Sequence, residues 1–182
     1  MLAELSAEAH SRKSWEISNG LGLWLSTRPD LRHVAIFAAL PGEPQVNHLH
    51  LLAPTVGFVY PLVHAEHRLS FHLVSDAATL EAGHLGIPEP HPQVHPELAV
   101  GDIDAFFCPG LAFSEGGVRL GRGGGFYDRA LAKARPEALR TGVFFGEQIC
   151  SALEGETHDI TMTHLADESG VREITPSPAD SV

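Results

Sequence analysis

The sequence predicts one α/β domain in which helices cover both faces of a mainly parallel sheet. Three observations lead to this fold class. Short apolar segments bounded by glycine or proline alternate along the chain with segments of helical periodicity. The chain has 182 residues, enough for one sizeable core but short for two domains. A glycine-rich stretch, residues 116–125, runs from a predicted strand into a predicted helix, and ligands of such sheets gather where strands end.

The first half of the chain is predicted to hold two helices and three strands. The helices are 6–25 and 46–52, and the strands are 33–40, 57–63 and 67–74. Ser6 is a suitable N-cap for the first helix, and Pro41-Gly42 ends the first strand. Apolar and polar residues alternate in the third strand, which predicts that one of its faces is exposed.

The second half begins with a proline-rich connection. Residues 83–96 contain four prolines, which exclude a regular helix and predict an extended surface loop. The elements predicted after it are a strand at 103–108, a helix at 127–134 and a strand at 139–145. We expect one domain over residues 1–174 and a disordered tail over 175–182.

Composition excludes several classes of partner and location. The formal charge of −11, from 12 basic and 23 acidic residues, opposes attraction to nucleic acid or to anionic lipid. The N-terminus has no secretory signal pattern, so we expect a cytoplasmic protein, and a monomer rather than an oligomer. Cys108 and Cys150 have no metal or redox spacing, and we expect both to be reduced and buried. We interpret the twelve histidines as surface residues.

The glycine-rich stretch has the chemistry of a phosphate-binding loop. Glycines allow close approach of the backbone, and the following helix start presents free N–H groups. Arg119 and Arg122 add positive charge to an acidic chain, and Asp128 is placed to help hold a magnesium ion between phosphates. The alternative is a flexible glycine-rich hairpin with two solvated arginines, and composition alone does not decide between them.

A longer pattern around this stretch resembles a known family. Residues 107–113 read F-C-P-G-L-A-F, and residues 119–131 read R-L-G-R-G-G-G-F-Y-D-R-A-L. Together they resemble the signature of 5-formyltetrahydrofolate cyclo-ligases, in which P-G-x-x-F precedes R-L-G-x-G-x-G-[YF]-Y-D. Residues 87–90, I-P-E-P, are similar to the extended I-x-x-P segment of the family. The resemblance extends from about Leu5 to Ile174.

The resemblance implies a fold and a reaction. Members of the family have a Rossmann-like three-layer α/β/α sandwich, and they use ATP and Mg²⁺ to close 5-formyltetrahydrofolate into 5,10-methenyltetrahydrofolate. The formyl oxygen attacks the γ-phosphate, and a second folate nitrogen then closes the ring with loss of phosphate. Such chemistry depends on alignment and charge neutralisation more than on a protein nucleophile.

Site residues follow from the resemblance position by position. The ATP-binding set is Arg119, Gly121, Arg122, Gly123, Gly124, Gly125, Phe126 and Tyr127, with Arg119 and Arg122 in catalytic roles. Phe126 and Tyr127 also close over the folate, and Glu43 faces its pterin ring. Asp128 and Asp159 correspond to the magnesium ligands. The alternatives are a solvated loop end for Glu43 and a turn or N-cap carboxylate for Asp159.

One family element has no counterpart in the sequence. Members usually begin with K-x-x-L-R, whose Lys and Arg reach the ATP phosphates, and this chain begins too late to include it. Arg12 and Lys13 fall later, in what the alignment makes the second half of the first helix. A folate- or nucleotide-binding protein with weak or no cyclo-ligase activity is therefore the alternative function. A sugar-phosphate or acyl-CoA enzyme on a related sheet is a third.

Overall fold

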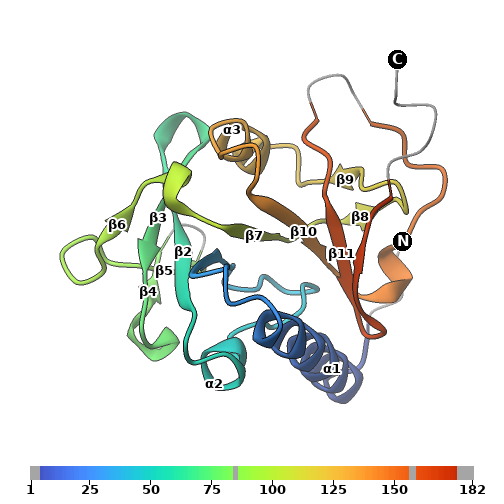
Figure 1. Cartoon of the computed structure of the whole chain (residues 1–182), viewed down its shortest axis with the longest axis horizontal. Helices are drawn as coiled ribbons and strands as arrows, with labels where there is room; N and C mark the ends of the chain where they lie inside the picture. The colour runs from blue at the N-terminus through green and yellow to red at the C-terminus, as the bar shows by residue number, and fades with distance from the viewer. Residues whose placement is uncertain (1–4, 84–85, 156–158, 176–182) are drawn as a thin grey trace.

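The computed structural model describes residues 5–83, 86–155 and 159–175, and an eight-stranded sheet forms their centre (Figure 1). The strand order is β12-β11-β10-β7-β1-β2-β3-β6. The strands of this sheet are β1 (His33–Ala35), β2 (Gly57–His64), β3 (Arg68–Leu73), β6 (Glu97–Leu98), β7 (Ala105–Cys108), β10 (Leu139–Val143), β11 (His164–Asp167) and β12 (Gly170–Glu173). Two small hairpins lie outside it, namely β4 (Glu81–Ala82) with β5 (Pro88–Glu89), and β8 (Ala112–Phe113) with β9 (Arg119–Leu120).

The central strands of the sheet are parallel. β1 pairs in parallel with β2 on one side, where Val34 lies opposite Phe58, and with β7 on the other, where Val34 lies opposite Ala105. β7, β10 and β11 continue the parallel arrangement, while β3, β6 and β12 pair antiparallel at the two edges. The chain leaves β1 toward β2 but continues from β7 in the opposite direction, so the topological switch point lies between β1 and β7.

Helices lie on both faces of the sheet. α1 (Ala7–Ser26) and α2 (Leu49–Leu52) lie on one face and α3 (Phe126–Leu131) lies on the other (Figure 1). Side chains alternate between two cores, because neighbouring residues of a strand point to opposite faces. Phe107 packs in the core of α1, whereas Phe106 packs in the core of α3. The predicted three-layer α/β fold is confirmed.

Several predicted bounds need correction. The strand predicted at 33–40 ends at Ala35, although Ile36 still donates a backbone hydrogen bond to Val59 over 2.9 Å. The helix predicted at 127–134 is α3, which begins at Phe126 and ends at Leu131. The predictions omitted the β11–β12 hairpin, which pairs antiparallel and turns at Gly170 with φ of +120°.

The polar face of β3 is buried, so the prediction of a half-exposed strand is wrong. Ser70 and His72 are buried because they satisfy each other: the Ser70 Oγ and His72 Nε2 atoms are 2.9 Å apart. His72 Nδ1 donates to the carbonyl of His95 over 2.9 Å. His95 is buried too, as is Glu89, so histidines are not confined to the surface and the 83–96 segment is only partly a surface loop.

Two further expectations concern residues away from the core. Cys108 is buried as predicted, but Cys150 is exposed. Residues 176–182, most of the predicted disordered tail, lie outside the described residues, as do residues 1–4. Among the residues that the structure describes, no helix has the length and apolar character needed to cross a bilayer.

Candidate active site

A cavity of about 630 Å³ opens at the topological switch point of the sheet. Phe37 and Ala38, which follow β1, form part of its lining together with Pro109 and Gly110, which follow β7. This is the position where open α/β sheets bind ligands, because the loops after neighbouring strands separate there. The cavity brings together every residue that the sequence predicted for the site, from Glu43 to Asp159.

The glycine-rich loop, residues 121–125, forms one wall of the cavity. Gly123 and Gly125 have φ of +82° and +61°, a left-handed conformation that side chains disfavour. A Cβ atom at Gly121 would lie 2.9 Å from a guanidinium nitrogen of Arg119. Because α3 has only one and a half turns, the positive charge of this wall comes from the arginines rather than from a long helix dipole.

Arg119 is anchored under the loop and is not a solvated arginine. Its side chain is 5% exposed, and its Nη2 atom lies 2.9 Å from Oδ1 of Asp128, whose side chain is 25% exposed. The guanidinium carbon also lies 5.4 Å from the centre of the Tyr127 ring. The Nε atom of Arg119 is buried without a hydrogen-bond partner in the described part of the chain. A buried donor left unpaired is costly, so the ion pair with Asp128 is the contact that stabilises Arg119 in this position.

Glu43 lines the cavity beside Arg122 of the loop and is not a solvated loop end. Its side chain is 7% exposed, and its Oε2 atom accepts a hydrogen bond from the backbone N–H of Leu40 over 3.0 Å. Its Oε1 atom accepts from Nη2 of Arg122 over 3.2 Å. Glu43 and Arg122 therefore form an ion pair, although the resemblance assigned Glu43 to folate and Arg122 to ATP.

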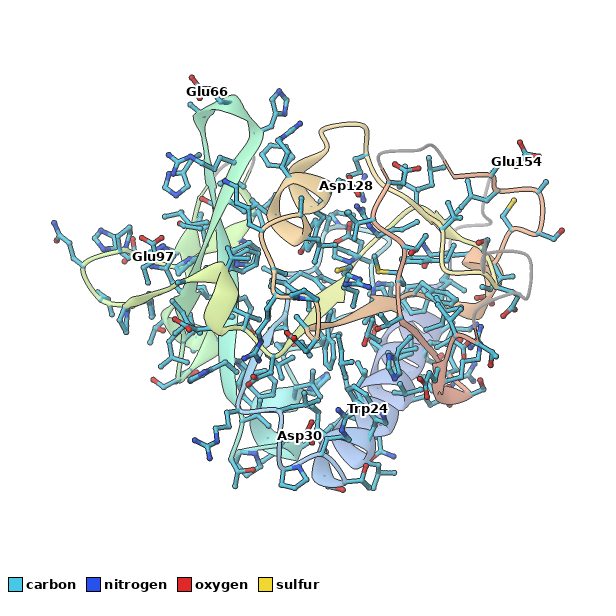
Figure 2. All side chains as sticks on the ribbon, turned by 45° about the horizontal axis from the view of Figure 1, so that its top comes forward. Trp24, Asp30, Glu66, Glu97, Asp128 and Glu154 are labelled. Atoms are coloured by element: carbon cyan, nitrogen blue, oxygen red, sulfur yellow. The ribbon has the colours of Figure 1, made fainter. Side chains whose placement is uncertain are left out.

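Asp128, which follows the glycine-rich loop in α3, and Asp159 both line the cavity (Asp128 is labelled in Figure 2). Their carboxylate oxygens suit Mg²⁺, which takes one or two protein carboxylates and completes its shell with water and phosphate oxygens. Across the residues described, no group of three or more His, Cys, Asp or Glu side chains is arranged to hold a metal ion. This donor set fits a magnesium ion that arrives with a phosphate ligand.

Two ionisable side chains near the loop are held neutral by burial. Burial raises the pKa of Tyr127 well above its ordinary value, with smaller contributions from Cys108 and Glu43 in the same direction. Burial likewise raises the pKa of the Cys108 thiol to about 12. Neither group is therefore an anionic nucleophile near neutral pH, and this agrees with a reaction that needs positioning and charge stabilisation.

Comparison with known proteins identifies the family. The model of the 5-formyltetrahydrofolate cyclo-ligase family matches residues 3–168. The chain belongs to this family. A curated cyclo-ligase of Mycolicibacterium smegmatis is 39% identical over 87 residues, which are 48% of this chain and 45% of that protein. The chain thus spans about half the length of this relative.

Two further relatives extend over more of the chain. A cyclo-ligase of Mycoplasma genitalium is 26% identical over 149 residues, which cover 80% of this chain and 79% of that protein. The NMR structure of a 5,10-methenyltetrahydrofolate synthetase of Aquifex aeolicus has a TM-score of 0.78 and 28% identity, covering 95% of this chain and 87% of that one. The likeness in fold therefore extends well beyond the signature.

Other walls of the cavity were not predicted from the sequence. Pro61 and Val63 of β2 and Leu69 of β3 form an apolar wall, and their alternating pattern indicated a strand but not a ligand. Residues 87–89 form another wall. The similarity of these residues to the family's I-x-x-P segment is the sequence feature that could have indicated this wall. A Cβ atom at Gly83 would lie 2.1 Å from the Glu89 carboxylate, so a side chain at this position would require the Glu89 side chain to move.

Proposed function

We propose that the chain converts 5-formyltetrahydrofolate into 5,10-methenyltetrahydrofolate with consumption of ATP, and that the cavity at the switch point is its active site. One observation carries the proposal: in a chain of this family, a single cavity joins a buried carboxylate, Glu43, to the glycine-rich loop and to two arginines, Arg119 and Arg122. A carboxylate pairs well with the N–H donors of a reduced pterin, and arginine pairs well with phosphate. The two walls thus suit the two substrates.

The proposed roles follow from the geometry of each side chain. Arg119 would contribute positive charge beneath the loop, and Arg122 would leave Glu43 to neutralise charge that develops at the γ-phosphate. Glu43, held by the N–H of Leu40, would orient the pterin so that the formyl oxygen faces the phosphate chain. Phe126 and Tyr127 would exclude water from the reacting groups.

Asp128 and Asp159 are the proposed magnesium ligands. When bound, Mg²⁺ supplies charge that neutralises the phosphate oxygens. Asp128 is already oriented by Arg119, whose guanidinium holds one carboxylate oxygen in place. The ion pair leaves the second oxygen of Asp128 available to a cation.

Product absorbance tests the proposal directly. Purified protein mixed with ATP, magnesium and 5-formyltetrahydrofolate should accumulate the methenyl product, which absorbs in the near ultraviolet. Omission of ATP is the control. Folded protein that yields no product at any enzyme concentration would refute the cyclo-ligase activity.

The second candidate is a folate- or nucleotide-binding protein without turnover. It is favoured by the placement of the basic residues of α1, which lie in the first half of the helix and not in the second as predicted. Lys13 forms ion pairs with Glu147 and, over 2.9 Å, with Glu168, while Arg12 lies 3.8 Å from Glu16. Within the described residues, the basic residues that line the cavity are Arg119 and Arg122. Calorimetry that finds folate binding without ATP consumption would support this candidate.

A further inference from the structure

We propose that Arg129 is a positioning residue that holds the glycine-rich loop in the peptide orientation that binds phosphate. The inference rests on the proposed function, because it concerns how this loop would meet the phosphate chain of ATP. Arg129 follows Asp128 in α3 and is exposed, so neither its burial nor the sequence pattern marked it as part of the site. Its hydrogen bonds to the backbone carry the argument.

Arg129 engages two successive carbonyl groups of the loop. Its Nη2 atom donates to the carbonyl oxygen of Gly124. Its backbone N–H donates to the carbonyl oxygen of Gly125 over 3.2 Å. The Arg129 side chain therefore fixes the direction of the Gly124 carbonyl, and the first backbone bond of α3 fixes that of Gly125.

The direction of these carbonyls decides what the loop offers to a ligand. In a trans peptide the C=O and N–H groups point in opposite directions. With both carbonyls turned toward Arg129, the N–H groups of Gly125 and Phe126 point away from it. Gly124, Gly125 and Phe126 all line the cavity. An anion binds to successive N–H groups and is repelled by carbonyl oxygens, so a flipped peptide would replace an attraction by a repulsion.

Arg129 also ties the loop to the β2–β3 hairpin. Its Nε atom donates to the carbonyl of His67 over 3.2 Å. Glu66 and His67 form the tip of this hairpin with φ of +60° and +54°, a conformation that costs energy for residues other than glycine (Figure 2). The His67 ring lies 5.0 Å from the Phe126 ring, measured between centres. The strained tip and the loop thus hold each other, and Arg129 bonds to both.

Binding measurements on Arg129→Ala test the proposal. We expect the affinity for ATP with magnesium to fall by roughly 10- to 100-fold, the value of one charge-assisted hydrogen bond, with 5-formyltetrahydrofolate affinity unchanged. Lys133→Ala is the matched control, because it removes a positive charge from the exposed segment just after α3 and should leave both affinities unchanged. Arg129→Lys should recover part of the ATP affinity, since one ammonium group can reach Gly124 but cannot present a fork to His67 as well.

The outcomes separate this inference from the proposed function. Wild-type protein that binds ATP or inorganic tripolyphosphate but shows no turnover would contradict the reaction and leave the role of Arg129 testable on the same probe. Equal ATP affinity in wild type and Arg129→Ala would overturn the inference. So would a parallel loss of ATP and folate affinity, because that would indicate a general structural defect. If Arg129→Ala does not fold, the comparison of Arg129→Lys with wild type decides in the same way.

Discussion

Asp128 pairs with Arg119 and is also a proposed magnesium ligand, and different substitutions separate these two roles. Asp128→Asn keeps an oxygen acceptor for Arg119 but loses the charge that would hold magnesium. We expect its turnover to fall by about 100-fold or more, as for other lost charge-stabilising contacts, and its free energy of unfolding to fall by less than that of Asp128→Ala, because a hydrogen-bond acceptor remains. Asp128→Ala should lose turnover and also about 1 to 3 kcal/mol of stability, because a buried guanidinium loses its partner. Product absorbance and urea unfolding measure the two effects, and unchanged turnover in Asp128→Asn would remove this residue from the metal site.

The ion pair between Glu43 and Arg122 predicts that the two substrates bind cooperatively. Each ligand would take one partner of the pair and release the other for the second ligand. Because the Arg122 side chain is 50% exposed, the pair is a weak one, and we expect bound folate to raise nucleotide affinity by only about two- to fivefold. Calorimetric titration with a non-hydrolysable ATP analogue, with and without folate, gives this factor. Arg122→Ala should bind the analogue more weakly and show no enhancement, and a factor that survives the substitution would contradict the role of the pair.

At the scale of elements, the sequence predicted the parallel strands better than their surroundings. The segments that form β1, β2, β7 and β10 each contain two or more consecutive buried residues, so both faces of these strands are covered there. β11 and β12 have no apolar run, because Arg172 packs over Phe144 and pairs with Asp167 where an apolar residue would be expected. Local periodicity does not predict the tertiary contacts that a strand makes.

The candidate site shows the same division. The glycine-rich loop and Asp128 could be singled out as candidates, since their chemistry is concentrated in ten consecutive residues, and the family resemblance then favoured a phosphate site over a flexible hairpin. The polar stripe on α1 could not, because its residues are ordinary helix residues until their partners are known. His10, Ser14 and Ser18 recur every four residues and all reach the segment that carries Glu43. His10 donates to the carbonyl of Glu43 over 3.0 Å.

This stripe predicts that α1 positions the segment of Glu43, which is proposed to bind folate. The buried Ser14 hydroxyl accepts from the N–H of Gln45 over 3.1 Å, and the buried Ser18 hydroxyl donates to the carbonyl of Gln45 over 3.0 Å. Ser14→Ala and Ser18→Ala should each lower the free energy of unfolding by about 1 kcal/mol and raise KM for folate more than KM for ATP. Ser26→Ala is the matched control, since its hydroxyl bonds to Leu23 at the far end of the helix. Equal changes in the two KM values would indicate loss of stability alone.

Across the whole molecule, the two ends of the parallel strands serve different purposes. The carboxyl ends open into the cavity, whereas the amino ends of β1, β7 and β10 converge on Asp104. The Asp104 carboxylate accepts from the backbone N–H groups of Arg32 and His33 over 2.7 and 2.8 Å and pairs with Arg135. The backbone of Asp104 bonds to His33 and to Leu139 over 2.9 Å each. Asp104 thus connects three strands at their amino ends, opposite the cavity.

Asp104 should therefore govern acid stability without affecting catalysis. Burial by itself would raise the pKa of Asp104, but hydrogen bonds from His33, Arg32 and Arg135 lower it below the ordinary 3.8. A carboxyl group with a lowered pKa in the folded state stabilises the fold above the unfolded pKa, and this contribution is lost as pH falls through the folded value. Asp104→Asn should lose about 1 to 2 kcal/mol at neutral pH, and its difference from wild type should shrink below pH 3.8. Urea unfolding at neutral pH and below pH 3.8 measures the difference in stability, and KM for each substrate at neutral pH measures the effect on the site. If the loss of unfolding free energy in Asp104→Asn stays constant in acid, the charge of Asp104 is not its source. A raised KM would show that the amino and carboxyl ends of the parallel strands are not independent.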